Sequence, residues 1–461
     1  MIRITTILFV LVFASQQLVA QHFASGIKIG EVDQTSAIVW ARLTEKSKAN
    51  FDLLKRELKH PMPDDIVPGQ RGEMRLELQS KMSKDGNFTV RINDWIAVGK
   101  ETDFTHQFSL SDLEPDTGYK LTIHSREQGA DSVANSISGS FRTAPVADES
   151  VPVRFIVTTC QAVRTVDSGK EGHAAYAKML DFDPHFFVHT GDIVYYDKKP
   201  LAKTVAQARA KWNLIFSYGY NKTFHQQVPS YFMKDDHDTL KNDCWPGQSY
   251  GDITFEKGLS IFREQVPMGE KTYRTYRWGK DVQIWMTENR DFRSSNKKED
   301  GPEKTILGAE QKKWLMETIS ASDAKYKFII SPGPIVGPDK KGKADNHAND
   351  AFLNEGQQLR DFLSKQERTY VICGDRHWQY CSKDQKTGLL ELGCGPINDQ
   401  HNFGGDPGED LDIHRYFSSK GGYLGITVED GNAKATWFGV NDADGKVLIK
   451  AKALHTEALG K

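Results

Sequence analysis

Six short apolar runs in the second half of the chain each end in a cluster of residues suited to binding metals or phosphate. The runs are rich in Val, Ile and Phe and barely alternate with polar residues, which is typical of strands buried on both faces. They cover residues 153–158, 185–188, 230–233, 282–286, 327–330 and 370–373. Because residues just past the strand ends of a layered α/β fold converge on one crevice, we expect one shared site.

The clusters that follow these runs combine several kinds of ligand and charge. In chain order they are Thr159-Cys160-Gln161, Gly191-Asp192-Ile193-Val194-Tyr195, Asp235-Asp236-His237-Asp238, Glu288-Asn289-Arg290, Ser331-Pro332-Gly333 and Gly374-Asp375-Arg376-His377. Carboxylates, a thiol, a phenol, imidazoles and arginines would meet in the crevice. This combination predicts metal-assisted chemistry on an anionic substrate.

The 461 residues are too many for one ordinary core, so two domains are expected. Residues 21–145 show short strands between turn residues, which predicts an all-β domain. The stretch 113–121 is typical of the tyrosine corner of immunoglobulin-like and fibronectin-type sandwiches. In residues 151–461 strands alternate with helical patterns, which predicts an α/β domain. The helices are expected at residues 172–180, 204–216, 309–319 and 355–363.

Residues 1–20 have the features of a secretory signal peptide. Arg3 supplies an early positive charge, an apolar run covers residues 7–14, and the small Ala20 suits cleavage. A buried first strand is the alternative. The apolar run is too short to span a bilayer, so we expect an exported protein, periplasmic or extracellular. The net charge of −2 gives no electrostatic case for nucleic acid as a partner.

The five cysteines leave one unpaired if the protein is exported. Cys160 is the candidate for the unpaired thiol because it ends a strand inside the polar constellation. Cys244 and Cys381 could form a disulfide, which the sequence leaves open. Cys160 could instead be a nucleophile activated by a histidine, as in a cysteine hydrolase. That alternative does not explain the accumulated carboxylates, whereas metal binding does.

Asp192 and the acidic segment around His237 carry the strongest metal signal. A carboxylate just after a buried strand and a glycine can bridge two cations through its separate oxygens. Tyr195 could turn back to the same metal, and a phenol binds only when ionised, which favours ferric iron. Three carboxylates around His237 would repel one another unless cations or arginines offset the charge. Turn chemistry and a solvated acidic loop are the alternatives.

Arg290 ends the strand at residues 282–286, where an arginine can hold phosphate or sulfate oxygens through two parallel donors. The alternative is an internal salt bridge to Asp291 or Glu288. Arg293, Asn242 and Glu288 are further candidates for contacts with substrate.

The order of the motifs resembles that of the PhoD-like alkaline phosphatases, a branch of the calcineurin-like metallophosphoesterases. The motifs are Cys-Gln, Gly-Asp-x-x-Tyr, Asp-Asp-His-Asp, Asn-Arg-x-x-Arg and Gly-Asp-x-His. Residues 36–43 are similar to the fibronectin-like N-terminal domain of that family. Residues 307–315 are similar to its Leu-Gly-x-x-Gln-x-x-Trp-Leu helix.

The resemblance implies a four-layer α/β/β/α sandwich preceded by a fibronectin- or Ig-like β-domain, with a dinuclear centre at the strand ends. It implies Fe³⁺ held by Cys160, Asp192, Tyr195 and His377, with Ca²⁺ beside it. Asp192 matches the bridging carboxylate, and Asp236, His237 and Asp375 match further site positions. Carboxylate-rich ligation also admits Mg²⁺, Mn²⁺ or Zn²⁺ at the second site.

Together these observations predict a secreted phosphoesterase that hydrolyses small phosphate mono- or diesters with metal-activated water. His237 would stabilise charge or protonate the leaving oxygen, and Arg290 would clamp a phosphoryl oxygen. The alternatives are the same fold acting on a phospholipid headgroup or sulfate ester, and a non-catalytic surface-binding protein. The natural substrate and the oligomeric state are left open.

Overall fold

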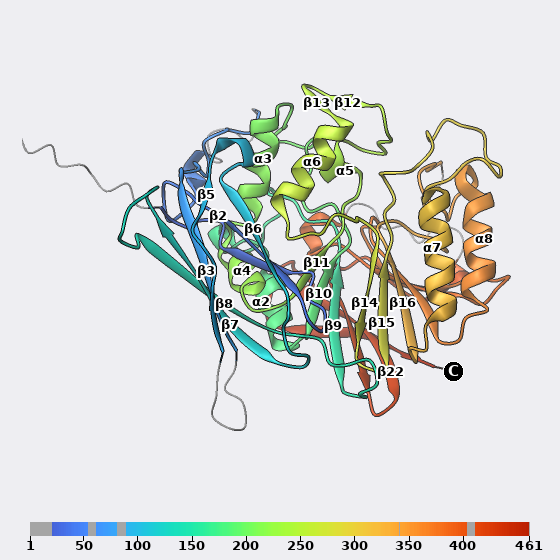
Figure 1. The fold of residues 1–461 in the computed structure, drawn as a ribbon. Helices are drawn as coiled ribbons and strands as arrows, with labels where there is room; N and C mark the ends of the chain where they lie inside the picture. Colours follow the sequence, from blue (N-terminus) through green and yellow to red (C-terminus); the bar gives the residue numbers. More distant parts are fainter. Residues whose placement is uncertain (1–20, 54–60, 81–88, 341, 403–410, 461) are drawn as a thin grey trace, which may run out of the picture.

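The computed structural model describes residues 21–53, 61–80, 89–340, 342–402 and 411–460. The expected signal peptide, residues 1–20, lies outside the described residues. Two large sheets pack face to face and helices cover their outer faces (Figure 1). Within the described residues, no helix has the length and apolar character needed to cross a membrane.

The first sheet has nine strands in the order β23-β22-β21-β9-β10-β11-β1-β2-β6. Its centre is parallel: β10 pairs with β9 and β11, and β1 pairs in parallel with β11. In chain order its strands are β1 (Ile27–Gly30), β2 (Ala37–Arg42), β6 (Thr105–Leu110), β9 (Val153–Thr158), β10 (Phe186–His189), β11 (Ser230–Phe232), β21 (Gly422–Glu429), β22 (Asn432–Asn441) and β23 (Val447–Leu459). The apolar runs at residues 153–158, 185–188 and 230–233 are therefore the parallel centre of this sheet.

The second sheet has seven strands in the order β14-β15-β16-β17-β19-β18-β20. Strands β15, β16, β17 and β19 are parallel, and the strands at the two edges are antiparallel. In chain order its strands are β14 (Arg274–Trp278), β15 (Val282–Met286), β16 (Tyr326–Ser331), β17 (Thr369–Cys373), β18 (Gln379–Lys383), β19 (Leu390–Cys394) and β20 (His414–Ser418). The other three apolar runs form β15, β16 and β17.

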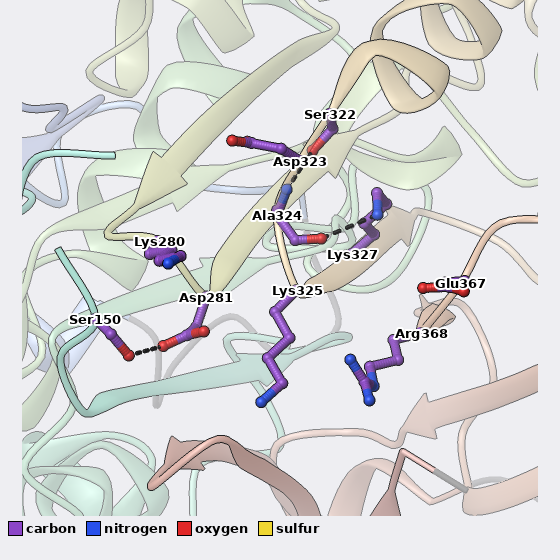
Figure 2. Close-up of a pocket in the computed structure, with 10 residues that line it drawn as sticks. All are labelled: Ser150, Lys280, Asp281, Ser322, Asp323, Ala324, Lys325, Lys327, Glu367 and Arg368. Carbon is purple, nitrogen blue, oxygen red and sulfur yellow. Dashed lines mark hydrogen bonds between the residues drawn. The ribbon is translucent and has the colours of Figure 1, made fainter. Parts of the chain in front are cut away.

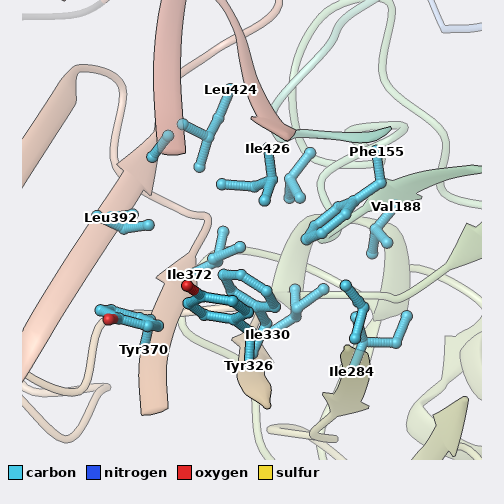
Figure 3. Packing of buried hydrophobic residues seen from close by; sticks show 14 of the residues in the cluster. Phe155, Val188, Ile284, Tyr326, Ile330, Tyr370, Ile372, Leu392, Leu424 and Ile426 are labelled. Carbon is cyan, nitrogen blue, oxygen red and sulfur yellow. The ribbon is translucent and has the colours of Figure 1, made fainter. Parts of the chain in front are cut away.

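The main hydrophobic core lies between the two sheets. Phe155 and Val188 of the first sheet face Ile330 and Ile372 of the second, and all four side chains are fully buried (Figure 3). The opposite faces of these strands are also covered, because the neighbouring Ile156 and Phe187 of the first sheet and Ile329 and Val371 of the second are fully buried in two further hydrophobic cores. This two-sided burial explains why the strands read as unbroken apolar runs.

Helices α2 (Ala174–Asp181) and α4 (Gly219–His225) cover the outer face of the first sheet, where Tyr176 packs with Phe187. Helices α7 (Gly308–Ala321) and α8 (Leu353–Leu363) cover the outer face of the second, where Leu315 and Leu359 share a core with Ile329. The predicted four-layer α/β/β/α arrangement is confirmed. A further core forms around α3 (Val205–Ile215) and α6 (Phe255–Gln265), and the sequence did not indicate α4 or α6.

Residues 21–145 form two β-layers, but one layer belongs to the nine-stranded sheet. Strands β1, β2 and β6 extend that sheet beyond β11. The other layer consists of β3 (Gly72–Ser80), β4 (Val90–Ile92), β5 (Ile96–Val98), β7 (Gly118–Arg126) and β8 (Asn135–Arg142). The predicted tyrosine corner is confirmed, because the Tyr119 hydroxyl accepts a 2.8 Å hydrogen bond from the backbone N–H of Glu114. The boundary between the domains at residues 145–151 stays a prediction.

All five cysteines are buried free thiols. Cys244 lies in the core around α3 and α6, whereas Cys381 lies between the two large sheets. The disulfide that the sequence left open between them is therefore not formed.

Candidate metal centre

Three of the expected ligands occupy strained turns just past strand ends. Cys160, Asp192 and Asp375 have φ angles of 49°, 58° and 62°, a left-handed region that non-glycine residues seldom adopt. Strain of this kind persists where the surrounding structure enforces it, commonly at functional sites. Gly191 allows the loops to meet, because a Cβ there would lie 2.6 Å from the backbone nitrogen of Asp235.

Asp192 lies at the centre of the site. Its Oδ2 accepts hydrogen bonds from the Tyr195 hydroxyl at 3.0 Å and from the Cys160 thiol at 3.4 Å. Three sets of potential ligand atoms contain Asp192, and within each set the atoms lie within 4.8 Å of one another. The sets are Cys160–Asp192–His377, Asp192–Asp236–His237 and Asp192–Asp235–Asp375. A carboxylate shared in this way has the geometry of a bridging ligand.

The buried groups at this centre fit cations. Burial raises the pKa of Asp192 to about 7, and neighbouring Asp236 and Asp235 add to the rise. Burial also raises the pKa of Cys160 and of Tyr195 well above their ordinary values. Oδ1 of Asp192, Oδ2 of Asp235 and Oδ1 of Asp236 have no hydrogen-bond partner among the described residues. Buried oxygens are normally paired, and bound cations would satisfy them and keep the ligands ionised.

His237 is held by a carboxylate on the loop that carries Tyr195. Its Nδ1 lies 2.6 Å from Oδ1 of Asp197, whose Oδ2 accepts a 3.0 Å hydrogen bond from the backbone N–H of Asn242. Burial opposes the charged imidazole, but Asp236, Asp192 and Asp197 outweigh it and raise the pKa of His237 to about 10. The ring is thus protonated near neutral pH, with Nε2 as the nitrogen that Asp197 does not engage.

A pocket of about 660 Å³ opens beside the ligand cluster. Its lining residues are Ala162, Arg164, Thr165, Tyr195, Lys198, Lys199, His237, Asn242, Lys340, His377 and His401. Four of them are lysine or arginine, and none is a carboxylate. Asn242, proposed from the sequence as a substrate contact, is exposed in this pocket. The pocket can therefore receive an anion next to the site that suits cations.

Arg290 is buried and is not among the residues that line the pocket. Its side chain is buried, and Nη2 lies 2.6 Å from Oδ1 of Asp235, 3.6 Å from Oδ2 of Asp345 and 3.9 Å from Oδ1 of Asp236. These three carboxylates hold the pKa of Arg290 well above its ordinary value against the effect of burial. The internal salt bridge weighed from the sequence exists, but with Asp235 rather than Asp291 or Glu288.

Arg293 and Glu288 are also buried away from the pocket lining. Arg293 donates hydrogen bonds to the Asn296 side chain at 2.6 Å and to the backbone carbonyl of Asp345 at 2.8 Å. Glu288 pairs with the buried Lys234 at 2.6 Å. The contacts that the sequence suggested between these residues and substrate stay predictions, and their positions favour a supporting role.

Several residues of the site do not directly follow an apolar run, and the sequence patterns did not indicate them. His401 Nε2 lies 2.8 Å from the Tyr195 hydroxyl, and the ring of His401 lies against that of His377. Asp243 and Asp345 join Asp236 in a fourth set of potential ligands. Only the short spacing after Tyr195 could have pointed to a role for Asp197.

A four-layer α/β/β/α core with carboxylates, a thiol and imidazoles gathered at its strand ends defines the metallophosphoesterase class. Comparison with known families agrees. The profile described as "PhoD-like phosphatase" matches residues 155–437, and that described as "PhoD-like phosphatase, N-terminal domain" matches residues 11–145. The chain belongs to the PhoD-like phosphatase family.

Individual relatives are distant in sequence. The chain is 20% identical over 425 residues to alkaline phosphatase D of Bacillus subtilis (strain 168), an alignment that covers 78% of this chain and 65% of that protein. A solved structure of PhoD has a TM-score of 0.73 at 16% identity and covers 95% of this chain and 89% of its own. A solved structure of a purple acid phosphatase from yellow lupin seeds has a TM-score of 0.62 at 13% identity and covers 92% of this chain and 72% of its own. At these identities the solved structures show the shared fold alone.

Proposed function

We propose that the protein is an exported, metal-dependent hydrolase that cleaves phosphate mono- or diesters with water. The observation that carries this proposal is Asp192, a buried carboxylate common to three sets of ligand atoms beside a pocket lined by positive side chains. Membership of the PhoD-like phosphatase family supports a phosphoester as substrate. The signal-like residues 1–20 support export.

Cys160, Asp192, Tyr195 and His377 would hold Fe³⁺, the cation best suited to a thiolate and a phenolate together. Asp192, Asp235 and Asp375, which form one ligand set, would hold a second cation, and Asp236, which shares another set with Asp192, is a further candidate ligand. The cation would be Ca²⁺ by the family resemblance, with Mg²⁺, Mn²⁺ or Zn²⁺ as alternatives that oxygen ligands also accept. When bound, such cations lower the pKa of water and polarise phosphoryl oxygens. The raised pKa values of Asp192 and Cys160 make proton release part of loading the site.

His237 is the proposed proton donor to the leaving oxygen. It lines the pocket, and Asp197, which belongs to none of the ligand sets, lies 2.6 Å from Nδ1 and favours the protonated ring. Asp197 orients the ring through Nδ1 and directs Nε2 away from itself. General acid catalysis by a positioned imidazole typically contributes about 10²–10⁴-fold in rate.

Cys160 is poorly suited to be a nucleophile. Its thiol is fully buried, and burial together with Asp192 raises its pKa well above the ordinary value. Since the thiolate is the reactive form, a cysteine-dependent hydrolase is disfavoured. A phospholipid headgroup or sulfate ester remains an alternative substrate for the same site.

The test is hydrolysis by the purified protein combined with elemental analysis. We expect release of 4-nitrophenol from 4-nitrophenyl phosphate or from bis(4-nitrophenyl) phosphate, loss of that activity on chelation and its return when metal is added. Measurement with 4-nitrophenyl sulfate and with a short-chain phosphatidylcholine covers the alternative esters. A metal-loaded protein that hydrolyses none of these compounds would favour a non-catalytic binding role.

A further inference from the structure

Four positive side chains surround the mouth of the pocket, and we call Arg164, Lys198, Lys199 and Lys340 the cationic rim. All four are exposed, whereas Tyr195, His237 and His401 at the floor of the pocket are buried. The rim residues come from three loops, which follow β9, β10 and β16. The rim is therefore a tertiary arrangement at the entrance, separate from the ligand cluster.

Three of the four rim charges, on Arg164, Lys198 and Lys199, are not balanced by carboxylates within the pocket. None of Arg164, Lys198 and Lys199 forms an ion pair in the part of the chain that the structure describes, and no carboxylate lines the pocket. Arg164, Lys198 and Lys199 are like charges on the same pocket, and such charges repel one another, which costs stability unless an anion binds among them. An anionic ligand would relieve this repulsion.

A second pocket shows that this imbalance is not general on the surface. It lies where the strands of the second sheet begin, whereas the ligand cluster lies where strands end. Asp281, Lys325 and Arg368 immediately precede β15, β16 and β17 there (Figure 2). Its positive residues Lys280, Lys325, Lys327 and Arg368 are mixed with Asp281, Asp323 and Glu367. Positive and negative charges are interleaved there, whereas the rim carries one sign only.

The size of the catalytic pocket indicates that more than the reacting phosphoryl group is held. Its volume of about 660 Å³ falls within the range of roughly 300–1,000 Å³ that is usual for pockets enclosing whole small-molecule ligands. The ligand cluster and His237 account for the phosphoryl group at the floor. The rim is therefore available to contact the leaving group of the ester.

We propose that the cationic rim selects phosphate esters whose leaving group carries an additional negative charge, such as a carboxylate or a second phosphate. This inference rests on the proposed phosphoesterase function and assigns the class of substrate. Exposed lysines on flexible stems attract such a group without fixing one geometry, so the rim favours charge rather than a particular shape. The attraction weakens as salt screens it.

Two substrates of nearly equal size test the proposal: 4-carboxyphenyl phosphate, which has a charged leaving group, and 4-carbamoylphenyl phosphate, which does not. The kcat/KM ratio of the two is compared between wild type and a rim variant, Lys198→Gln/Lys199→Gln/Lys340→Gln, by following phosphate release. Comparing ratios cancels the intrinsic reactivity of each ester. We expect the ratio to fall about tenfold in the variant, mainly through KM, as three exposed ionic contacts would give. In wild type the ratio should also fall with added salt.

The control is Lys280→Gln/Lys325→Gln/Arg368→Gln, which removes the same number of positive charges from the pocket of mixed charge. It should keep the wild-type ratio, because only the overall charge changes. Equal ratios in wild type and the rim variant, or an equal fall in the control, would overturn the role of the rim while leaving the hydrolase intact. Failure of wild type to hydrolyse either ester would overturn the proposed function itself.

Discussion

The Cys160 thiol lies 3.4 Å from Oδ2 of Asp192, and burial raises the pKa of both groups. Two buried acids at this distance resist ionising together, because each negative charge would disfavour the other. A cation between them reverses that preference. The pair therefore links the fold, which buries both groups at neighbouring strand ends, to the proposed metal chemistry.

Replacement of Asp192 by Asn should lower the content of both metals together and reduce activity by orders of magnitude. Asp192 is common to three ligand sets, and an amide cannot supply two anionic oxygens. Elemental analysis of the purified variant and steady-state kinetics measure the two effects. Asp281→Asn is a matched control, because Asp281 is also a buried carboxylate but lies at the start of β15, away from the ligand cluster. Loss of one metal alone would show that Asp192 is a terminal ligand.

Replacement of Tyr195 by Phe should shift or abolish a visible absorption band of the iron-loaded protein. The Tyr195 hydroxyl faces Asp192 and His401, and an ionised phenol bound to Fe³⁺ absorbs by charge transfer. Tyr196→Phe is the control, since that neighbouring buried hydroxyl instead accepts a hydrogen bond from the Trp212 indole at 2.7 Å. A colourless, iron-free wild type with full activity would contradict the assignment of iron.

Replacement of Arg290 by Ala should lower the free energy of unfolding of the metal-free protein, prepared with a chelator, by about 3–5 kcal/mol. This is the usual cost of leaving buried charges without their partner. Asp235, Asp236 and Asp345 would lose a shared cation. Arg290→Lys should recover part of the loss, since it keeps the charge but not the parallel N–H donors of the guanidinium. Chemical denaturation measures the effect. The exposed Arg142–Asp116 pair, at 2.7 Å, is the control, and Arg142→Ala should cost under about 1 kcal/mol.

The same variant also tests the phosphoryl clamp that the sequence suggested for Arg290. A clamp would lower kcat/KM by about 10²-fold while metal content and stability stayed near wild type. Unchanged unfolding with that kinetic loss would support the clamp and contradict the supporting role.

The stability of the metal-free protein should fall as pH rises, because His237 loses its proton. Its pKa is raised from 6.5 to about 10 in the folded state, so the folded protein binds this proton more tightly than the unfolded chain. The stabilisation is complete below about pH 6.5 and is lost as pH approaches about 10. Asp197→Asn removes the partner at 2.6 Å and should move the fall to lower pH. Urea denaturation across this range measures it, and coincident curves for both proteins would rule out the coupling.

The sequence by itself determined the central strands and most of the ligands. Burial on both faces leaves unbroken apolar runs, and this local signal located β9, β10 and β17. Because β9 and β10 are parallel neighbours that end on the same side of one sheet, Cys160 and Asp192 were expected to meet from the sequence pattern alone. Asp375 follows β17 of the other sheet, so it joins them through the packing of the two sheets.

Only the tertiary structure decided which side chains face the pocket and which support it. The apolar pattern could not show that Arg290 turns inward to Asp235, because an arginine after a strand suits a clamp and a salt bridge equally. The pairing of β1 with β11 depends on strands far apart in the chain. His401 and the cationic rim lie on loops, where the sequence carries no periodic signal. Their positions follow from the packing of the two sheets, which brings distant loops to one edge.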